Sequence, residues 1–217
     1  MEFLRRIFTP DKKWPEIPIE EIRKRARLLV IDDIDFYYYD LFKRDGYVID
    51  KWDDIESLDK LEQGHYDIIL LDINDVGKQY SQEQGLGILK HLKKVSPWQI
   101  IIAYSDASFS LTYQEFFLAA DARLSKSEDY VQYKSTVDRL LKAQFSLGFY
   151  VDKVISIVQP YGVDVERIKQ ATERAILRNT TAPLEGALSA YIDKKDVIGM
   201  VLNVVQVAVG IAAICAK

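Results

Sequence analysis

The stretch Ile68-Ile69-Leu70-Leu71-Asp72 places four apolar residues in succession and then a carboxylate. A β-strand that is covered on both faces is apolar at every position, as strands of parallel sheets are. Leu28-Leu29-Val30-Ile31 has the same character and runs directly into Asp32-Asp33. The two stretches therefore predict two buried parallel strands, each of which ends in acidic residues.

Between Arg27 and about Leu147, strands of this kind alternate with amphipathic helical patterns. The expected strands are Arg27–Ile31, Tyr47–Ile49, Asp67–Leu71, Gln99–Tyr104 and Ala122–Leu124. The expected helices cover residues 36–44, 55–63, 86–94, 111–120 and 130–145, with Ser57 as the N-cap of the second. This alternation predicts an α/β domain with a five-stranded, doubly wound parallel sheet.

The segments on either side of this domain have a different character. Residues 1–26 are expected to form an N-terminal arm, and residues 148–217 show no further alternation of strands. Helical patterns cover residues 149–158, 163–178 and 183–192, and the chain ends in an apolar run at 197–216. We therefore expect an α/β domain over residues 27–147 and a helical output or oligomerisation region over residues 148–217.

Composition limits the class of protein. The 217 residues carry a net charge of −4 and a single cysteine, Cys215, and residues 148–217 hold about as many basic as acidic side chains. This balance is not that of a nucleic-acid reader, and one cysteine excludes an internal disulfide framework. The first six residues lack the apolar core of a signal peptide. A cytoplasmic location is expected, with the cytoplasmic face of the inner membrane as the alternative.

Polar and charged residues follow four of the five expected strands. Asp32-Asp33 follow the first, Asp72 the third and Ser105 the fourth, and Lys126 comes two residues after the fifth. The carboxyl ends of parallel strands meet at one edge of the sheet, so these side chains are expected to converge in one crevice. Three carboxylates, a hydroxyl and an ammonium are groups that can hold a divalent cation and a phosphoryl group.

A phosphoryl-accepting site accounts for all of these groups. A carboxylate can attack a phosphohistidine as a nucleophile, and Mg²⁺ between the two offsets their repulsion. Mg²⁺ prefers oxygen ligands, which Asp32, Asp33, Asp72 and the backbone carbonyl of Asn74 can supply. Lys126 would neutralise the phosphoryl charge. The hydroxyl of Ser105 would donate a hydrogen bond to a phosphoryl oxygen.

These segments resemble the receiver domain of two-component response regulators over residues 27 to about 146. The resemblance implies a flavodoxin-like fold, Mg²⁺ binding by Asp32 and Asp33, phosphorylation of Asp72, and sensing of the phosphoryl group by Ser105 and Lys126. The resembling segments are Leu-Leu-Val-Ile-Asp-Asp (28–33), Asp-Ile-Ile-Leu-Leu-Asp-Ile (67–73), Gly-Leu-Gly-Ile-Leu-Lys-His-Leu (85–92), Ile-Ala-Tyr-Ser (102–105) and Ala-Asp-Ala-Arg-Leu-Ser-Lys (120–126).

The sequence departs from the family pattern in the surroundings of the site. The loop after Asp72 lacks the usual proline, and Gly85 comes thirteen residues after Asp72 instead of about eight. Asp106 replaces a small residue, Ser127 replaces a proline, and Arg123 replaces the aromatic residue of the fifth strand. An Arg123–Asp106 ion pair is one substitute for the aromatic switch. The phosphorylation chemistry is complete, and the readout is unorthodox.

Three other features of the sequence do not indicate a functional site. His65 and His91 lie far apart in the pattern and have no ligand partners at zinc spacing. Gly85-Leu86-Gly87 sits at a helix start and is no phosphate loop. Tyr37-Tyr38-Tyr39 lacks the basic neighbours of a nucleic-acid stacking platform.

The run from Val197 to Ala216 is free of charge over twenty residues, and as a helix it is about 30 Å long, enough to cross a bilayer. Asn203 and Gln206 interrupt it, and no aromatic belt flanks it. We favour a helix buried in a bundle or in an oligomer interface, with membrane insertion as the main alternative. Self-stacking as β-structure is a third reading, since the run is valine-rich and free of proline.

These observations lead to one functional hypothesis and two alternatives. We expect a bacterial phosphorelay response regulator, phosphorylated on Asp72 by a histidine kinase or a phosphotransfer protein, that controls its C-terminal helices. Beyond its own phosphotransfer and autodephosphorylation, no enzyme activity is expected. The alternatives are a receiver-like interaction module that works without phosphate and a membrane effector that inserts residues 197–216.

Overall fold

The computed structural model describes residues 17–105 and 111–215. They form two compact units, residues 18–143 and the chain from Gln144 onward. The first six residues and Asp106 lie outside the described ranges, so expectations that fall on them stay expectations. Each unit is described by itself below.

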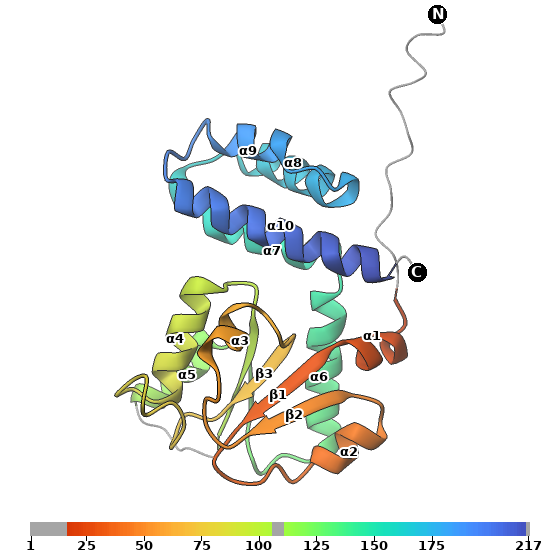
Figure 1. Cartoon of the computed structure of the whole chain (residues 1–217), viewed down its shortest axis with the longest axis vertical. Coiled ribbons are helices and arrows are strands. Elements are labelled where there is room, and N and C mark those ends of the chain that lie inside the picture. Colours follow the sequence, from red (N-terminus) through yellow and green to blue (C-terminus); the bar gives the residue numbers. More distant parts are fainter. Residues whose placement is uncertain (1–16, 106–110, 216–217) are drawn as a thin grey trace, which may run out of the picture. The chain divides into compact units, whose positions relative to one another are not determined.

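The first unit is built on a five-stranded parallel sheet (Figure 1). The strands are ordered β2-β1-β3-β4-β5, which is the flavodoxin-like order, with a topological switch point between β1 and β3. The predicted fold class is therefore confirmed for this unit. The strands are β1 (Arg27–Ile31), β2 (Val48–Trp52), β3 (Ile68–Leu71), β4 (Ile100–Tyr104) and β5 (Ala122–Leu124).

Burial follows from the position of each strand in the sheet. Every residue of β3 and β4 is buried, because helices cover both faces of these central strands. The edge strand β2 pairs only with β1 and keeps Val48 and Asp50 exposed while Ile49 and Trp52 are buried. The expected end of this strand at Ile49 was wrong, because the polar pair at positions 50 and 51 is tolerated on an edge strand.

Helices pack on the two faces of the sheet (Figure 1). On one face, Leu61, Leu89 and Phe116 join a core with alternate residues of β1, β3 and β4. On the other face, Phe36 lies 5.9 Å from Phe42 and 5.8 Å from Tyr133, measured between ring centroids. The helices of this unit are α1 (Ile19–Arg25), α2 (Tyr39–Arg44), α3 (Leu58–Glu62), α4 (Gly85–Val95), α5 (Leu111–Ala119) and α6 (Tyr130–Gln144).

Several helix boundaries follow from local capping. The Ser57 hydroxyl accepts a hydrogen bond from the Lys60 N–H at 3.3 Å, which confirms Ser57 as the N-cap of α3. The first helix after β1 begins at Tyr39, three residues later than the pattern predicts. Phe36 lies before that start and is buried against the aromatic residues of α2 and α6.

The second unit is helical, as the pattern predicts. Ser146 caps α7 by accepting from the Phe149 N–H at 3.3 Å, and Asp164 caps α8 by accepting from the Arg167 N–H at 3.0 Å. Asn179 ends α8 in the left-handed conformation. The helices are α7 (Leu147–Val158), α8 (Val165–Arg178), α9 (Ala182–Leu188) and α10 (Lys195–Cys215), with a 3₁₀ turn at Gln159–Tyr161.

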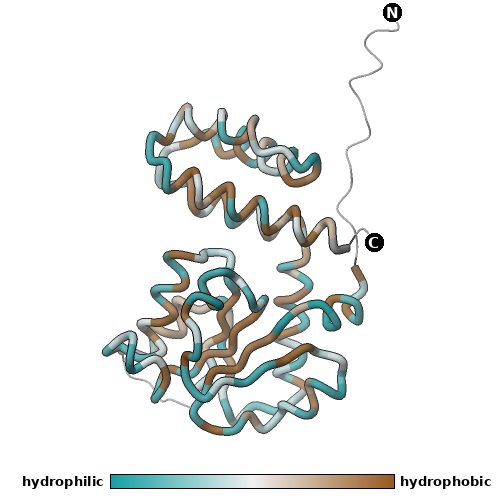
Figure 2. The backbone as a smooth tube through the Cα atoms, viewed as in Figure 1, coloured by the Kyte–Doolittle hydropathy of each residue, from teal (hydrophilic) through white to brown (hydrophobic). Residues whose placement is uncertain are grey.

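The long helix α10 contacts α7, α8 and α9 through one stripe. Val201, Val204, Val205 and Ala208 are fully buried, at the three- and four-residue spacing of a single helix face. Asn203 is exposed on the opposite side of the helix. Figure 2 shows hydrophilic residues among the hydrophobic ones along this helix. Lys195–Ala213 is also the one stretch of the described chain that is long and apolar enough to cross a membrane. The stripe shows that α10 has a packing partner within its own unit.

Candidate functional site

The site residues are held in place by the continuation of the sheet beyond the strands. The backbone N–H of Asp32 donates to the Trp52 carbonyl at 3.1 Å, and that of Asp72 donates to the Ile31 carbonyl at 3.0 Å. The Ser105 N–H donates to the Leu124 carbonyl at 3.2 Å. These bonds extend the ladders by one residue, so the side chains at the carboxyl edge start from fixed backbone positions.

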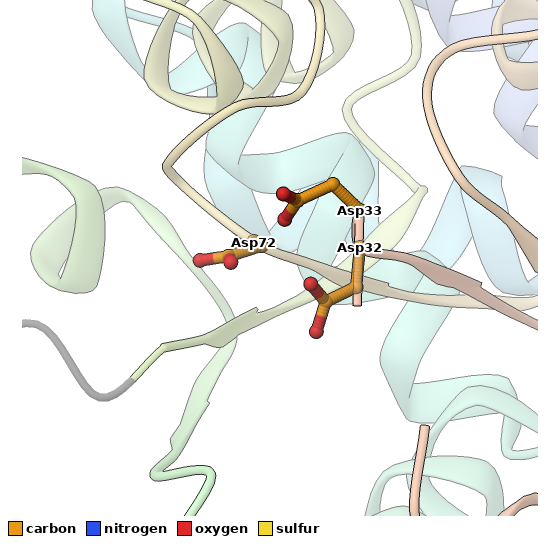
Figure 3. Close-up of side chains that lie close together, drawn as sticks. All are labelled: Asp32, Asp33 and Asp72. Carbon is orange, nitrogen blue, oxygen red and sulfur yellow. The ribbon is translucent and has the colours of Figure 1, made fainter. Parts of the chain in front are cut away.

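Three carboxylates converge at this edge (Figure 3). Asp32, Asp33 and Asp72 each offer an oxygen within 4.8 Å of the other two. Asp32 and Asp72 are buried, whereas Asp33 is exposed. The convergence expected from strand order is therefore present in the structure.

Lys126 binds the two buried carboxylates at once. Its Nζ lies 2.7 Å from Oδ2 of Asp72 and 2.8 Å from Oδ2 of Asp32. Burial alone would lower the pKa of this ammonium, but the hydrogen bonds and charges of the two aspartates outweigh burial and raise it. Lys126 is thus a fixed cation that offsets the repulsion between two carboxylates.

The second oxygen of each buried carboxylate is hydrogen-bonded to the backbone. Oδ1 of Asp72 accepts from the Ile73 N–H at 2.6 Å, and Oδ1 of Asp32 accepts from the Ile34 N–H at 3.0 Å. Oδ2 of Asp32 is buried and lies against the Lys126 ammonium. The two Oδ2 atoms therefore depend on a cation for compensation.

Tyr104 is a member of the site that sequence reasoning did not assign. It is the last residue of β4, it is buried, and its ring lies 5.1 Å from the Lys126 ammonium. Burial, followed by the charges of Asp32 and Asp72, raises the pKa of its phenol, so the hydroxyl stays protonated. The sequence signal was a tyrosine beside the strand-end serine, in a strand that is otherwise aliphatic.

Gly85 is a second residue whose role emerges only in the structure. A Cβ atom at this position would lie 2.0 Å from the carbonyl oxygen of Asp72 and 2.8 Å from Cα of Ile73. The Gly85 N–H donates to the Ile73 carbonyl at 3.1 Å. Only glycine permits this approach, so the start of α4 packs directly on the backbone of Asp72. The thirteen-residue spacing thus preserves a glycine contact through a longer loop.

That loop is held by bonds of its own. The Asp75 N–H donates to Oε1 of Gln84 at 2.7 Å, and the Gly77 N–H donates to Oδ1 of Asp54. Asp75 and Gln84 both have positive φ angles, 60° and 54°. Asn74, the expected source of a backbone ligand, lies at the start of this loop and is exposed.

Ser105, an expected site residue, is buried directly after β4.

Two of the departures from the family pattern lie on β5 and in the turn that follows it. The exposed Arg123 stacks over the Phe117 ring at 5.2 Å, and the Arg123–Asp106 pair falls outside the described residues because position 106 does. The Ser127 N–H donates to the Ser125 hydroxyl oxygen at 3.2 Å, which closes the turn after Lys126.

The donor set fits a hard divalent cation. The carboxylates of Asp32, Asp33 and Asp72 are oxygen donors near one another, and Asp33 opens the group to solvent. Mg²⁺ takes one or two protein carboxylates and keeps several waters, so a partly open set of this kind suits it. It would share Asp32 and Asp72 with the Lys126 ammonium.

Receiver domains are among the solved structures that are similar to this chain. A receiver domain protein of the CheY type from Methanospirillum hungatei is 25% identical over 55% of this chain and 95% of its own, with a TM-score of 0.45. This part of the chain resembles a receiver domain. The Vibrio cholerae chemotaxis protein CheY4 is 20% identical over 53% of this chain and 98% of its own, with a TM-score of 0.43.

A third receiver domain, that of DrrB in a BeF₃-activated state, is 19% identical over 54% of this chain and 97% of its own, with a TM-score of 0.43. All three likenesses cover about half of the chain. No family model matches the chain. No curated protein matches it by sequence.

Proposed function

We propose that this protein is a response regulator that accepts a phosphoryl group on Asp72. The convergence of the Asp32, Asp33 and Asp72 carboxylates, two of which (Asp32 and Asp72) bind Lys126, carries the proposal. It supplies a nucleophile, metal ligands and a charge-neutralising cation within one small volume. The phosphoryl donor is a phosphohistidine of a histidine kinase or of a phosphotransfer protein.

The transfer balances without any further reactant. A carboxylate oxygen of Asp72 attacks the phosphorus, a P–O bond forms, and the P–N bond to the donor histidine breaks. The leaving imidazole takes up a proton from solvent water, and the product is an acyl phosphate on Asp72. Hydrolysis of this mixed anhydride by water resets the protein.

The chain positions and neutralises the reacting groups. The Ile73 N–H fixes one carboxylate oxygen of Asp72, and the Lys126 ammonium at the other can pair with the incoming phosphoryl oxygens. Ser105 at the end of β4 can donate its hydroxyl proton to the same group. Mg²⁺, when held by Asp32, Asp33 and Asp72, would supply positive charge between the carboxylates and the phosphoryl group.

Transfer would also alter the ion pair on which the site rests. In the present structure Lys126 binds Asp32 and Asp72 together. Once Asp72 is phosphorylated, Lys126 pairs with the phosphoryl oxygens instead. We propose that this exchange biases a two-state equilibrium of the loops around the site and that the helical unit is the element controlled.

Incubation with acetyl phosphate and Mg²⁺ tests the proposal directly. Mass spectrometry is expected to detect one added phosphoryl group, labile to hydroxylamine, in the wild type and none in Asp72→Asn. Asp75→Asn is the matched control, because this aspartate lies on the following loop and pairs with Lys78 on the surface. Phosphorylation of Asp75→Asn should equal that of the wild type.

The alternative of a phosphate-independent interaction module predicts a different result. An unmodified wild type, under conditions that phosphorylate a known receiver domain in the same tube, would overturn the proposal. So would equal labelling of the wild type and Asp72→Asn, because the acceptor would then be another residue.

A further inference from the structure

The helical unit contains a pocket that the proposed phosphorylation chemistry does not use. It lies between α8 and α9, which contact each other and run side by side in Figure 1, and its volume is about 330 Å³. Ligand pockets begin at about this size. The lining residues are Arg167, Gln170, Ala171, Arg174, Ala175, Arg178, Thr180, Pro183 and Ala187.

Three arginines line this pocket from one helix. Arg167, Arg174 and Arg178 are separated by seven and four residues, so they fall on a single stripe of α8. At 1.5 Å per residue the row extends over about 16 Å. The guanidinium forks of long side chains can therefore meet an extended anion or close on a smaller one.

The charges of Arg167 and Arg174 are not balanced within the pocket. No carboxylate is among its lining residues. Arg167 and Arg174 form no ion pair with any side chain of the described chain, and both are exposed. Guanidinium groups bind phosphate through paired, parallel N–H donors, which makes phosphate the natural complement of such a row.

The rest of the lining is different in character. Ala171, Ala175, Pro183 and Ala187 give the pocket an apolar floor, on which Ala175 and Ala187 are buried. The Thr180 hydroxyl and the Gln170 amide, which donates to Glu166, add two neutral polar groups. A simple inorganic anion would leave this floor without a partner, whereas an organic phosphate has an apolar body that covers it.

We propose that the α8–α9 pocket is a binding site for a soluble small molecule that carries a diphosphate, of the class of a nucleoside diphosphate. The phosphates lie along the arginine row, and the base packs on the alanine and proline floor. All of the lining residues belong to the helical unit, so the pocket is complete without any residue of the Asp72 site.

Calorimetric titration of the full-length protein with ADP tests the site. ADP is expected to bind with one site per chain, and inorganic pyrophosphate is expected to compete with it. Arg174→Gln should weaken ADP binding at least about tenfold, and Arg167→Gln should do so as well. Lys169→Gln, an exposed substitution on α8 outside the pocket, is the matched control and should bind as the wild type does.

Several results would overturn the proposal. One is a wild-type protein that is folded, as its thermal unfolding shows, and does not bind ADP. Equal weakening by Lys169→Gln and Arg174→Gln would indicate general charge attraction instead of a site. Equal binding of adenosine and ADP would remove the role of the phosphates. Binding to vesicles of phosphatidylglycerol or to polyglutamate, without binding to ADP, would assign the arginine row to a membrane or to an acidic peptide.

The Asp72→Asn variant separates this site from the proposed function. It is expected to bind ADP as the wild type does, since its substitution lies outside the helical unit. Failure of ADP binding in both proteins would overturn the pocket proposal and leave phosphorylation of Asp72 untouched.

Discussion

Lys126 Nζ lies 2.7 Å from Oδ2 of Asp72, although 54 residues separate the two along the chain. The same ammonium lies 2.8 Å from Oδ2 of Asp32. Two buried carboxylates that share one cation repel each other whenever that cation is absent. The stability of this edge of the sheet therefore depends on Lys126, and so does its affinity for any competing cation.

Substitution of Lys126 by methionine should destabilise the protein in a metal-free buffer at pH 7. Removal of one partner from a largely buried ion pair leaves the other charge uncompensated, and we expect a loss of about 2–3 kcal/mol in the free energy of unfolding. Mg²⁺ should restore more stability to Lys126→Met than it adds to the wild type, because it no longer competes with the ammonium. Urea denaturation with and without Mg²⁺ measures both effects.

The exposed Lys90→Met is the matched control, since this lysine pairs with Glu83 and Glu115 on the surface. The free energy of unfolding of Lys90→Met should be less than about 1 kcal/mol below that of the wild type. Mg²⁺ should not change this difference. A Mg²⁺ response equal to that of Lys126→Met would contradict a metal site at Asp32 and Asp72.

Strand order made the convergence of Asp32, Asp33 and Asp72 predictable. Each follows an apolar run, and the carboxyl ends of parallel strands share an edge, so local pattern and topology gave the same answer. The edge strand was harder to delimit, because one of its faces meets water and Lys51 breaks its apolar pattern.

The contact of Gly85 with the Asp72 backbone and the role of the α8 arginines were missed for different reasons. Gly85 reaches the Asp72 backbone through a loop in which Asp75 and Gln84 adopt positive φ angles, and no periodic pattern encodes such a path. The spacing of Arg167 and Arg174 was visible in the sequence. Its meaning depended on the placement of α9 beside α8, which is a matter of tertiary packing.

Gly85→Ala should damage both the fold and the site. The new methyl group would lie 2.0 Å from a backbone oxygen, so α4 or the Asp72 strand end must move, and we expect a loss of about 1–3 kcal/mol. Gly186→Ala is the matched control, because nothing lies within 4 Å of a Cβ there and alanine favours helix α9 by up to about 1 kcal/mol. Thermal unfolding and acetyl-phosphate labelling are the two measurements. Wild-type stability and labelling in Gly85→Ala would contradict the close approach.

Asp67 should make the stability of the protein depend on pH. Burial raises the pKa of this carboxyl to about 6, against the pull of the Arg27 backbone N–H, from which it accepts a hydrogen bond at 2.8 Å. Between about pH 4 and pH 6, the Asp67 carboxyl is therefore protonated in the folded state and ionised in the unfolded chain. The free energy of unfolding should therefore fall as pH rises through this window, by about 1–3 kcal/mol.

Asp67→Asn should remove this fall, since the amide oxygen can accept the same hydrogen bond without ionising. The exposed Glu56→Gln should keep it. Urea denaturation at pH 4, 5, 6 and 7 provides the comparison, and a slope in Asp67→Asn equal to that of the wild type would assign the pH dependence to another group.

Val204→Asp should separate a bundle helix from a membrane helix. Val204 is fully buried on the stripe of α10, so a carboxylate there has no solvent and no partner, and we expect the helical unit to lose at least about 3 kcal/mol. Asn203→Asp places the same charge one residue earlier, at an exposed position, and should cost less than about 0.5 kcal/mol. Hydrogen exchange of α7 and α8 monitors the packing. If α10 instead crossed a membrane, the two variants would lower the membrane-bound fraction alike, because lipid would surround both positions.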